Sequence, residues 1–473
     1  ADVAPPLAKS EATSVTEAAQ FLYEGEAAIQ KGVPAGTMER EQVAVLRGRV
    51  TDRGGAGIAG VKVSVADHGD GAEEDFGHTA TRADGGFDIA VNGGAPLTLV
   101  FERQGYIPAQ RLVDAPWQDF IDVDPMVMVP YDGQETDVDT SGSASYSVAK
   151  GSPVTDGEGT RTATLLFEKG TETTMEVISG GRKSYQPVQD LDVRATEYTQ
   201  DTKTSGLSAM PGQLPPNTAF TYAAEFSVDE AVAAGATDVQ FSKPVVSYTD
   251  NFLDLPAGTL VPTGYYDREK EKWVGSRNGI VLEVLADDGA GAATFNLDAD
   301  PAADPDLYAG WGIDDAERSR VSSLYEPGKQ LWRVEIGHFT PWDYNMPYGP
   351  DGDSGAPGTG DPNGGSGDGG PGDCGQSGSL ILCDSQVLGE MLPITGAGMD
   401  LVYRSDRVPG RTAERRVEIP LVEGELRSGV QTVELEIAVA GQTHTKSFTR
   451  AEVVGGKTAE VFVWDGKDAY GRR

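Results

Sequence analysis

Cysteine and histidine are scarce in this sequence: two cysteines and four histidines occur among 473 residues. The histidines lie far apart in turn-like or strand-like contexts, and no HExxH or other paired spacing links them, so a zinc site is not predicted. No stretch approaches the roughly 20 apolar residues that a membrane-spanning helix needs. We therefore expect no membrane span, and structural or solvent-facing roles for His68, His78, His338 and His444.

Positive charge is also in short supply. The chain has 74 acidic and 38 basic residues, which gives a net charge of −36. Because affinity for nucleic acid depends on Lys and Arg side chains that displace counterions, a field of this sign argues against a nucleic-acid partner and against anionic lipids. The charge is typical of a large soluble surface, with salt adaptation and calcium binding as the two alternatives.

Motifs of catalysis are missing as well. There is no GxSxG nucleophile elbow for a serine hydrolase, and no glycine-rich phosphate loop between a strand and a helix. A pair such as Asp314 and Glu317 cannot be singled out as glycosidase carboxylates in a chain with 74 acidic residues. We therefore predict no enzyme activity, no catalytic residue and no cofactor.

Two acidic stretches do supply the hard oxygen ligands that calcium prefers. Neither matches the twelve-residue EF-hand loop, which needs a central Gly and a terminal Glu. We interpret both stretches as solvated acidic turns, and calcium binding stays open as the alternative. The acidic residues concerned are Asp298, Asp300, Asp304 and Asp306 in the first stretch, and Asp351 and Asp353 in the second.

What the sequence has in abundance is glycine, with 61 residues, and proline, with 28. Together with frequent Thr, Val, Asp and Ser, this composition is typical of short strands joined by tight turns. The chain is too long for one hydrophobic core, and its length favours about three domains. The predicted fold class is therefore all-β and multidomain.

The chain begins with a lead-in and a small β-sandwich. Residues 1–42 are mixed, with a capping box of Ser14 and Glu17 ahead of a short helix. Residues 43–131 alternate between apolar and polar in runs such as VKVSV and FDIAV, which is typical of strands half-buried against a core. The predicted interior side chains are Val61, Val63, Phe87, Ile89, Leu97, Leu99 and Phe101.

The strings GRVTDRGGAGIAGVKVSV, TATRADGGFDIAV and LTLVFERQGYIPAQ carry a family resemblance. They resemble the transthyretin-like, carboxypeptidase-regulatory sandwich found near the start of many bacterial Rhs (YD-repeat, teneurin-like) proteins. The resemblance implies structural roles, none of them catalytic, for Gly48, Gly60, Val61, Asp84, Gly85, Phe87, Gly105 and Tyr106.

Residues 132–348 form a second β-rich region, with a short helix predicted at 229–234. The strings VRATEYT, FTYAAEFSVDEAVAAGA, FSKPVVSYTDNFL and LWRVEIGHFTPWDYNMPYGP resemble the segment of Rhs proteins that precedes the repeat shell. That segment occupies the position of the fibronectin-like plug in teneurins. The resemblance therefore implies that this region is a plug built from one or two further sandwiches.

Residues 349–379 read as a flexible Gly/Asp/Pro/Ser linker with almost no apolar side chain to bury. Residues 380–473 return to strands, and GEMLPITGAGMDLVYRSDRVPGR and FVWDGKDAYGRR resemble the entry into an Rhs shell. Cys374 and Cys383 are close enough in an exported chain to form a disulfide across a ten-residue loop, which contributes roughly 2–3 kcal/mol in the chain-entropy model. Such a bridge would anchor the linker to the next strand.

The domain order and the resemblance predict a structural N-terminal region of a secreted protein. In the family, the repeat shell is a hollow cocoon that can enclose a C-terminal toxin, and N-terminal elements close it. The start at Ala1-Asp2-Val3 is what removal of a signal peptide would leave. We expect residues 132–348 to seal one end of a shell in the same polypeptide, with Trp332, Phe339 and Trp342 inserted into it.

The alternative from another class is an extracellular adhesin, a sandwich that binds a carbohydrate, a protein or a surface receptor, with calcium as a candidate cofactor. Exposed aromatic side chains on loop tips would favour this function, and their burial would favour the structural one. The aromatic residues that discriminate between the two are Trp117, Tyr131, Tyr265 and Tyr266.

Overall fold

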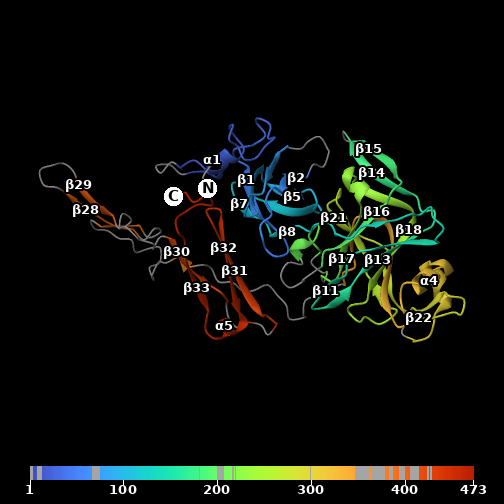
Figure 1. Ribbon diagram of the computed structural model, residues 1–473. Helices are drawn as coiled ribbons and strands as arrows, with labels where there is room; N and C mark the ends of the chain where they lie inside the picture. Colours follow the sequence, from blue (N-terminus) through green and yellow to red (C-terminus); the bar gives the residue numbers. More distant parts are fainter. Residues whose placement is uncertain are drawn as a thin grey trace. The chain divides into compact units, whose positions relative to one another are not determined.

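The computed structural model describes residues 4–7, 13–66, 75–179, 182–199, 207–215, 218, 220–298, 300–346, 363–364, 379–382, 387–393, 400–404, 415–422, 426 and 429–472. It divides into two compact units (Figure 1): Ser14–Gly349, and Pro350–Arg473 together with Ala1–Thr13. Strands dominate both units and the helices are few and short, so the all-β, multidomain fold class is confirmed. The helices among the described residues are too short or too polar to span a bilayer.

The lead-in contains the predicted capped helix, α1 (Val15–Ala19). Ser14 Oγ accepts from Glu17 N–H at 3.2 Å, and Glu17 Oε2 accepts from Ser14 N–H at 3.1 Å, which completes the capping box. A 3-10 turn, η1 (Gln20–Leu22), follows. The buried Gln30 amide then donates to Phe76 O and Ala90 O, so the lead-in is tied to the sandwich that it precedes.

The sandwich consists of two four-stranded sheets, drawn mainly in blue in Figure 1. The first has the order β4-β1-β7, with β8 also paired to β1; its strands are β1 (Val43–Thr51), β4 (Gly86–Asn92), β7 (Phe120–Asp122) and β8 (Met126–Val127). The second has the order β3-β2-β5-β6; its strands are β2 (Lys62–Val65), β3 (His78–Ala80), β5 (Ala95–Glu102) and β6 (Ala109–Ala115).

The predicted interior of the sandwich is confirmed. Six of the seven side chains are buried in one core, and Leu97 packs against it partly buried. Phe87 and Phe101 meet edge to face, with ring centroids 5.5 Å apart. Gly85 has φ +83°, and a Cβ there would lie 2.1 Å from Val50 O, so the predicted turn requires glycine at this position.

Residues 132–346 build two larger sheets that face each other. The nine-stranded sheet comprises β10 (Tyr146–Lys150), β13 (Ala163–Glu168), β14 (Thr173–Ser179), β15 (Arg182–Val188), β18 (Asp238–Asp250), β19 (Leu260–Val261), β22 (Gly279–Asp287), β23 (Ala293–Asn296) and β24 (Gln330–Phe339). The six-stranded sheet comprises β9 (Thr136–Asp137), β16 (Asp192–Glu197), β17 (Ala223–Val228), β20 (Gly264–Asp267), β21 (Lys272–Gly275) and β25 (Pro341–Asp343).

The two faces of β24 show how these layers form. Trp332, Val334 and Ile336 point into the core between the two sheets, because successive side chains of a strand alternate between its faces. Leu331 lies on the opposite face, in a second core that is covered by α3 (Pro305–Tyr308) and α4 (Asp315–Ser322). The predicted helix at 229–234 is confirmed as α2 (Asp229–Ala233).

Short elements complete the two units. In the first are the hairpin of β11 (Val154–Asp156) and β12 (Gly159–Arg161) and the turns η2 (Leu207–Ala209) and η3 (Ala309–Trp311). The described part of the second unit contains three small sheets. One is made of β26 (Asn363–Gly364), β30 (Arg416–Pro420) and β33 (Ala459–Val463), and another of β27 (Ser379–Leu382), β28 (Val387–Pro393) and β29 (Asp400–Arg404). The third is the pair β31 (Thr432–Val439) and β32 (Gln442–Thr449), which the helix α5 (Arg450–Val454) follows.

Several predictions concern residues that lie outside the described ranges. The proposed disulfide partners Cys374 and Cys383 are among them, as are His68, Asp351 and Asp353. The disulfide and the second acidic stretch therefore stay predictions.

Candidate functional site

The three aromatic residues expected to insert into a shell are instead buried in the core of their own region. Trp332 is 0% exposed, Trp342 2% and Phe339 4%. The Trp332 indole donates to Asn251 Oδ1 at 2.8 Å, and the Trp342 indole donates to His338 O at 3.0 Å. Side chains held in this way stabilise residues 132–346 from within, so a contact with a shell would have to use other residues.

The four aromatic residues whose exposure discriminates an adhesin from a structural module differ in how far they are buried. Tyr266 is buried, and Tyr131 and Tyr265 are half-buried. Trp117 is 59% exposed, although its indole donates to Gly93 O at 2.8 Å. One of the four rings is thus displayed on the surface of the sandwich.

The acidic residues considered as calcium ligands or as a carboxylate pair make contacts that stabilise turns, a helix end and the core. In the first acidic stretch, Asp298 and Asp304 accept main-chain N–H groups. Among the described residues, no three His, Cys, Asp or Glu side chains gather into a group that could hold a metal ion. Asp314 caps α4, and Glu317 is buried in an ion pair with Arg333 at 2.7 Å.

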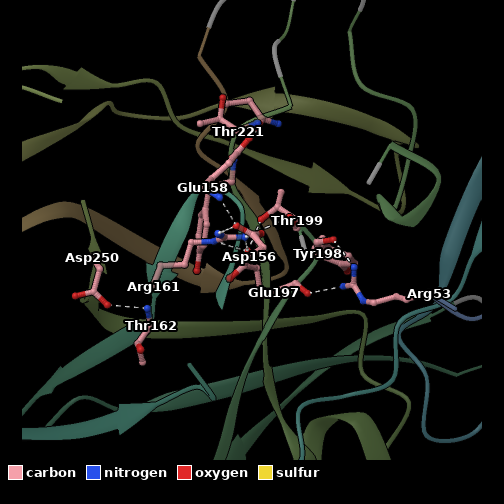
Figure 2. Close-up of polar contacts among 12 residues, drawn as sticks. Arg53, Asp156, Glu158, Arg161, Thr162, Glu197, Tyr198, Thr199, Thr221 and Asp250 are labelled. Carbon is pink, nitrogen blue, oxygen red and sulfur yellow. Dashed lines mark hydrogen bonds and ion pairs between the residues drawn. The ribbon is translucent and has the colours of Figure 1, made fainter. Parts of the chain in front are cut away.

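Arg161, Glu197 and Asp156 form a charge cluster in the first unit, which Figure 2 shows in close-up. The Arg161 guanidinium, 1% exposed, donates to Glu197 Oε1 at 2.7 Å and to the two Asp156 oxygens at 3.0 and 2.8 Å. Thr199 Oγ1 donates to Glu197 Oε1 at 2.6 Å. The guanidinium also lies 4.5 Å from the centre of the Phe252 ring, a cation–π contact.

Local structure explains how the cluster is assembled. In the β11–β12 hairpin the turn brings Asp156 opposite Gly159, and Asp156 Oδ1 accepts from Glu158 N–H at 2.9 Å. This places Asp156 and Arg161 on one short ribbon. Glu197 comes from the last position of β16, so the cluster joins the hairpin to the six-stranded sheet.

Burial and pairing act in opposite directions on these groups. Burial raises the pKa of Glu197, although Arg161 opposes the shift. Burial disfavours the charged guanidinium of Arg161, but the contacts with Asp156 and Glu197 prevail and raise its pKa. The arginine therefore stays charged, and the cluster depends on its acidic partners to offset the loss of hydration.

Arg53 links this cluster to the sandwich. It lies in the turn after β1, where Asp52 Oδ1 accepts from Ala56 N–H at 2.9 Å. Its guanidinium donates to Glu197 O at 2.8 Å and to Tyr198 O at 3.0 Å (Figure 2). A cavity of about 410 Å³ lies beside it; its lining includes Asp52, Arg53, Tyr131, Asp132, Ser152 and Glu197.

A second set of contacts joins the sandwich to the same region. Arg111, 3% exposed, donates to Met210 O at 2.9 Å and to Ser208 O at 2.8 Å. Because it is buried, its pKa falls to about 10. An apolar core spans the same junction; its buried members are Ile107, Val127, Val129, Tyr198, Ala209, Met210 and Ala223.

These contacts indicate what the site does physically. The polar groups of the cluster are occupied by one another or by main-chain atoms, and they lie where two β-rich regions meet. Such an arrangement sets the orientation of one region against the other. Sequence analysis missed it because Arg161 and Glu197 are 36 positions apart and no motif marks either residue.

Arg53→Ala tests this link. We expect the free energy of unfolding to fall by about 1–2 kcal/mol, since the carbonyls of Glu197 and Tyr198 lose a charged donor. Hydrogen exchange at residues 196–199 should accelerate. Arg49→Ala is the matched control, because Arg49 is exposed and donates to Asp84 O inside the sandwich at 2.7 Å. Equal exchange at residues 196–199 in both variants would contradict the link.

Comparisons with known proteins place the sandwich in a family. Residues 38–128 match the family described as Teneurin TTR-like domain. Teneurin-m of Drosophila melanogaster is 37% identical over 115 residues, which cover 24% of this chain and 4% of that protein. Teneurin-3 of Danio rerio is 40% identical over 103 residues, which cover 22% of this chain and 4% of that protein.

Teneurin-1 of Homo sapiens is 34% identical over 95 residues, which cover 20% of this chain and 3% of that protein. The matched part is thus a few per cent of the length of each of these relatives. The family match at residues 38–128 covers the sandwich and its approach, and not the two larger sheets. Residues 38–128 are therefore a TTR-like β-sandwich of the teneurin type, and this part of the chain is a teneurin-like region.

Proposed function

We propose that residues 14–349 are a non-catalytic structural module of an extracellular, Rhs/teneurin-like protein. In this proposal the module braces and plugs one end of a YD-repeat shell in the same polypeptide, and the shell can enclose a C-terminal toxin. The match of residues 38–128 to the Teneurin TTR-like domain carries the proposal. That the protein is secreted, and that the same polypeptide contains a repeat shell, are both parts of this proposal.

The junction between the sandwich and the two larger sheets supports a mechanical role. Arg53 and Arg111 each donate from the sandwich side to main-chain carbonyls of residues 197–210. Met210, whose carbonyl accepts from Arg111, is itself a buried member of the apolar core at this junction. A junction that combines buried apolar area with satisfied charged donors resists relative motion of the sandwich and the two larger sheets. A module that closes the end of a shell needs this rigidity.

A co-purification experiment tests the proposal. The repeats encoded downstream in the same reading frame would be expressed separately from this chain, and association would be measured by pull-down and sedimentation. We expect a stable complex, and we expect Arg53→Ala to weaken it while Arg49→Ala does not. A downstream sequence without YD repeats, or repeats that do not bind this chain, would refute the proposal.

The second candidate function is recognition of a carbohydrate, a protein or a surface receptor by the sandwich. The exposure of Trp117 is the observation that favours it, because exposed indole rings often anchor ligands at binding surfaces. This function does not require a shell, so it would survive failure of the co-purification experiment.

Trp117→Ala separates the two functions. If the sandwich is an adhesin, the variant should lose at least tenfold in affinity for glycan arrays or target cells. The free energy of unfolding should fall by no more than about 1.5 kcal/mol, the net value of the hydrogen bond from the indole to Gly93 O. Leu112→Ala, at a side chain that is also 59% exposed, is the control. Unchanged binding in both variants would remove the ground for the adhesin function.

A further inference from the structure

The outer edge of β6 has an unusual covering. In the sheet order β3-β2-β5-β6, strand β6 is terminal and pairs only with β5 among the described strands. An edge strand presents a row of N–H and C=O groups that can pair with another chain. In this protein, residues 208–213, which we call the edge cap, occupy that row.

The edge cap imitates a neighbouring strand. Gln110 N–H donates to Pro211 O at 2.7 Å. Two residues further along β6, Leu112 N–H donates to Gln213 Oε1 at 3.0 Å, and the Gln213 amide donates back to Leu112 O at 2.9 Å. This reciprocal pair of hydrogen bonds is the one that a residue on an antiparallel strand would make. One side-chain amide thus replaces the main chain of a missing strand.

Other contacts hold the edge cap in place. Arg111 binds its carbonyls at Ser208 and Met210, and the Met210 side chain is 1% exposed in the junction core. The Trp273 indole donates to Gln213 O at 3.0 Å. These contacts fix the main chain of residues 208–213, and the main chain in turn holds the Gln213 side chain beside Leu112.

The sequence of β6 also suits pairing with a copy of itself. An antiparallel register centred on Leu112 would place Leu112 opposite Leu112 and Gln110 opposite Asp114. No like charges would face each other, and the exposed Leu112 side chains would gain an apolar contact. Leu112 already points its N–H and C=O outward, as this register requires.

We propose that residues 208–213 are a built-in cap that prevents self-association of this protein, and that β6 pairs with β6 of a second copy when the whole cap is displaced from the edge. Loss of the Gln213 contacts frees the Leu112 end of the cap and so favours its displacement. The proposal goes beyond a bracing role and does not depend on a shell. Gln213 is exposed, so its replacement leaves the core intact.

The first test is amide hydrogen exchange in the full chain. In Gln213→Ala the Leu112 amide should exchange about tenfold faster in dilute solution, because its acceptor is gone. Gln134→Ala is the matched control, since the Gln134 amide also donates to a main-chain carbonyl, that of Lys150, at 2.9 Å. Unchanged exchange at Leu112 in Gln213→Ala would overturn the proposal.

The second test detects the dimer itself. Leu112→Cys would be combined with Cys374→Ser and Cys383→Ser and oxidised gently, with and without Gln213→Ala. Opposed residues in an antiparallel hydrogen-bonded pair lie close enough for a disulfide. We expect a covalent dimer only with Gln213→Ala. A dimer that forms equally with Gln213 present, or no dimer in either background, would overturn the proposal.

Discussion

Arg161→Met is expected to lower the free energy of unfolding of residues 14–349 by about 3–5 kcal/mol at neutral pH. The substitution leaves Glu197, 8% exposed, without the cation that offsets its loss of hydration. It also removes the bidentate contact with Asp156. Urea denaturation of the full chain, followed by circular dichroism and tryptophan fluorescence, measures the change.

Two further variants isolate the cause of this loss. Adding Glu197→Gln to Arg161→Met should recover part of the stability, because the buried side chain is then neutral. Arg40→Met should cost under about 1 kcal/mol, since Arg40 and Glu17 form an exposed ion pair at 3.4 Å. A loss below about 1 kcal/mol in Arg161→Met, or no recovery in the double variant, would show that the cluster does not support the fold.

Asp343→Asn is expected to stabilise the protein at pH 8 by a few kcal/mol, at most about 4 kcal/mol, and to change little at pH 4. Burial raises the pKa of Asp343 from 3.8 to about 7 in the folded protein. The folded state therefore keeps a proton that the unfolded chain releases. Asp343 contributes stability that is fully present below pH 3.8 and is lost as the pH rises through 7.

The substitution preserves the local geometry. Asp343 Oδ1 accepts from Asn345 N–H at 2.7 Å, and an Asn side chain can accept the same bond. Thermal unfolding between pH 4 and pH 8 measures the effect. Asp300→Asn, the same chemical change at an exposed turn, is the control and should leave the pH profile unchanged. Equal pH profiles for the wild-type protein and Asp343→Asn would contradict a buried, neutral carboxyl group.

The short-range features of the fold could be predicted from the sequence. The run FDIAV alternates with a period of two, and its Phe87 and Ile89 are buried in the sandwich core as expected. The capping box at Ser14 and the helix before Gly235 depend on residues within one turn of each other. Local rules suffice for such features because the interacting groups are neighbours in the chain.

Sequence analysis found the strand that contains Trp332 but not what covers it. Alternation separates the two faces of β24, yet a face that packs inside its own region and a face that packs on a partner have the same pattern. For this reason the hypothesis that Trp332 and Trp342 insert into a shell was physically reasonable from the sequence and conflicts with their burial. The short helix α3 was also missed, because Asp and Pro around residues 298–306 read as turns. Helix α4 was missed because its sequence, DAERSRVS, has almost no apolar side chains to show a helical period.

By itself, the sequence determined that this protein is built of many short strands, since strands follow from periodicity and turn chemistry between neighbouring residues. The teneurin-like character of the sandwich was implied by the resemblance of its sequence to a known family. Only the tertiary structure decided that Arg161 meets Glu197 and that Gln213 closes the edge of β6. Those contacts join residues 36 and 101 positions apart. An arginine or a glutamine in the sequence does not indicate which distant residue it will contact, because the packing of the sheets determines that pairing.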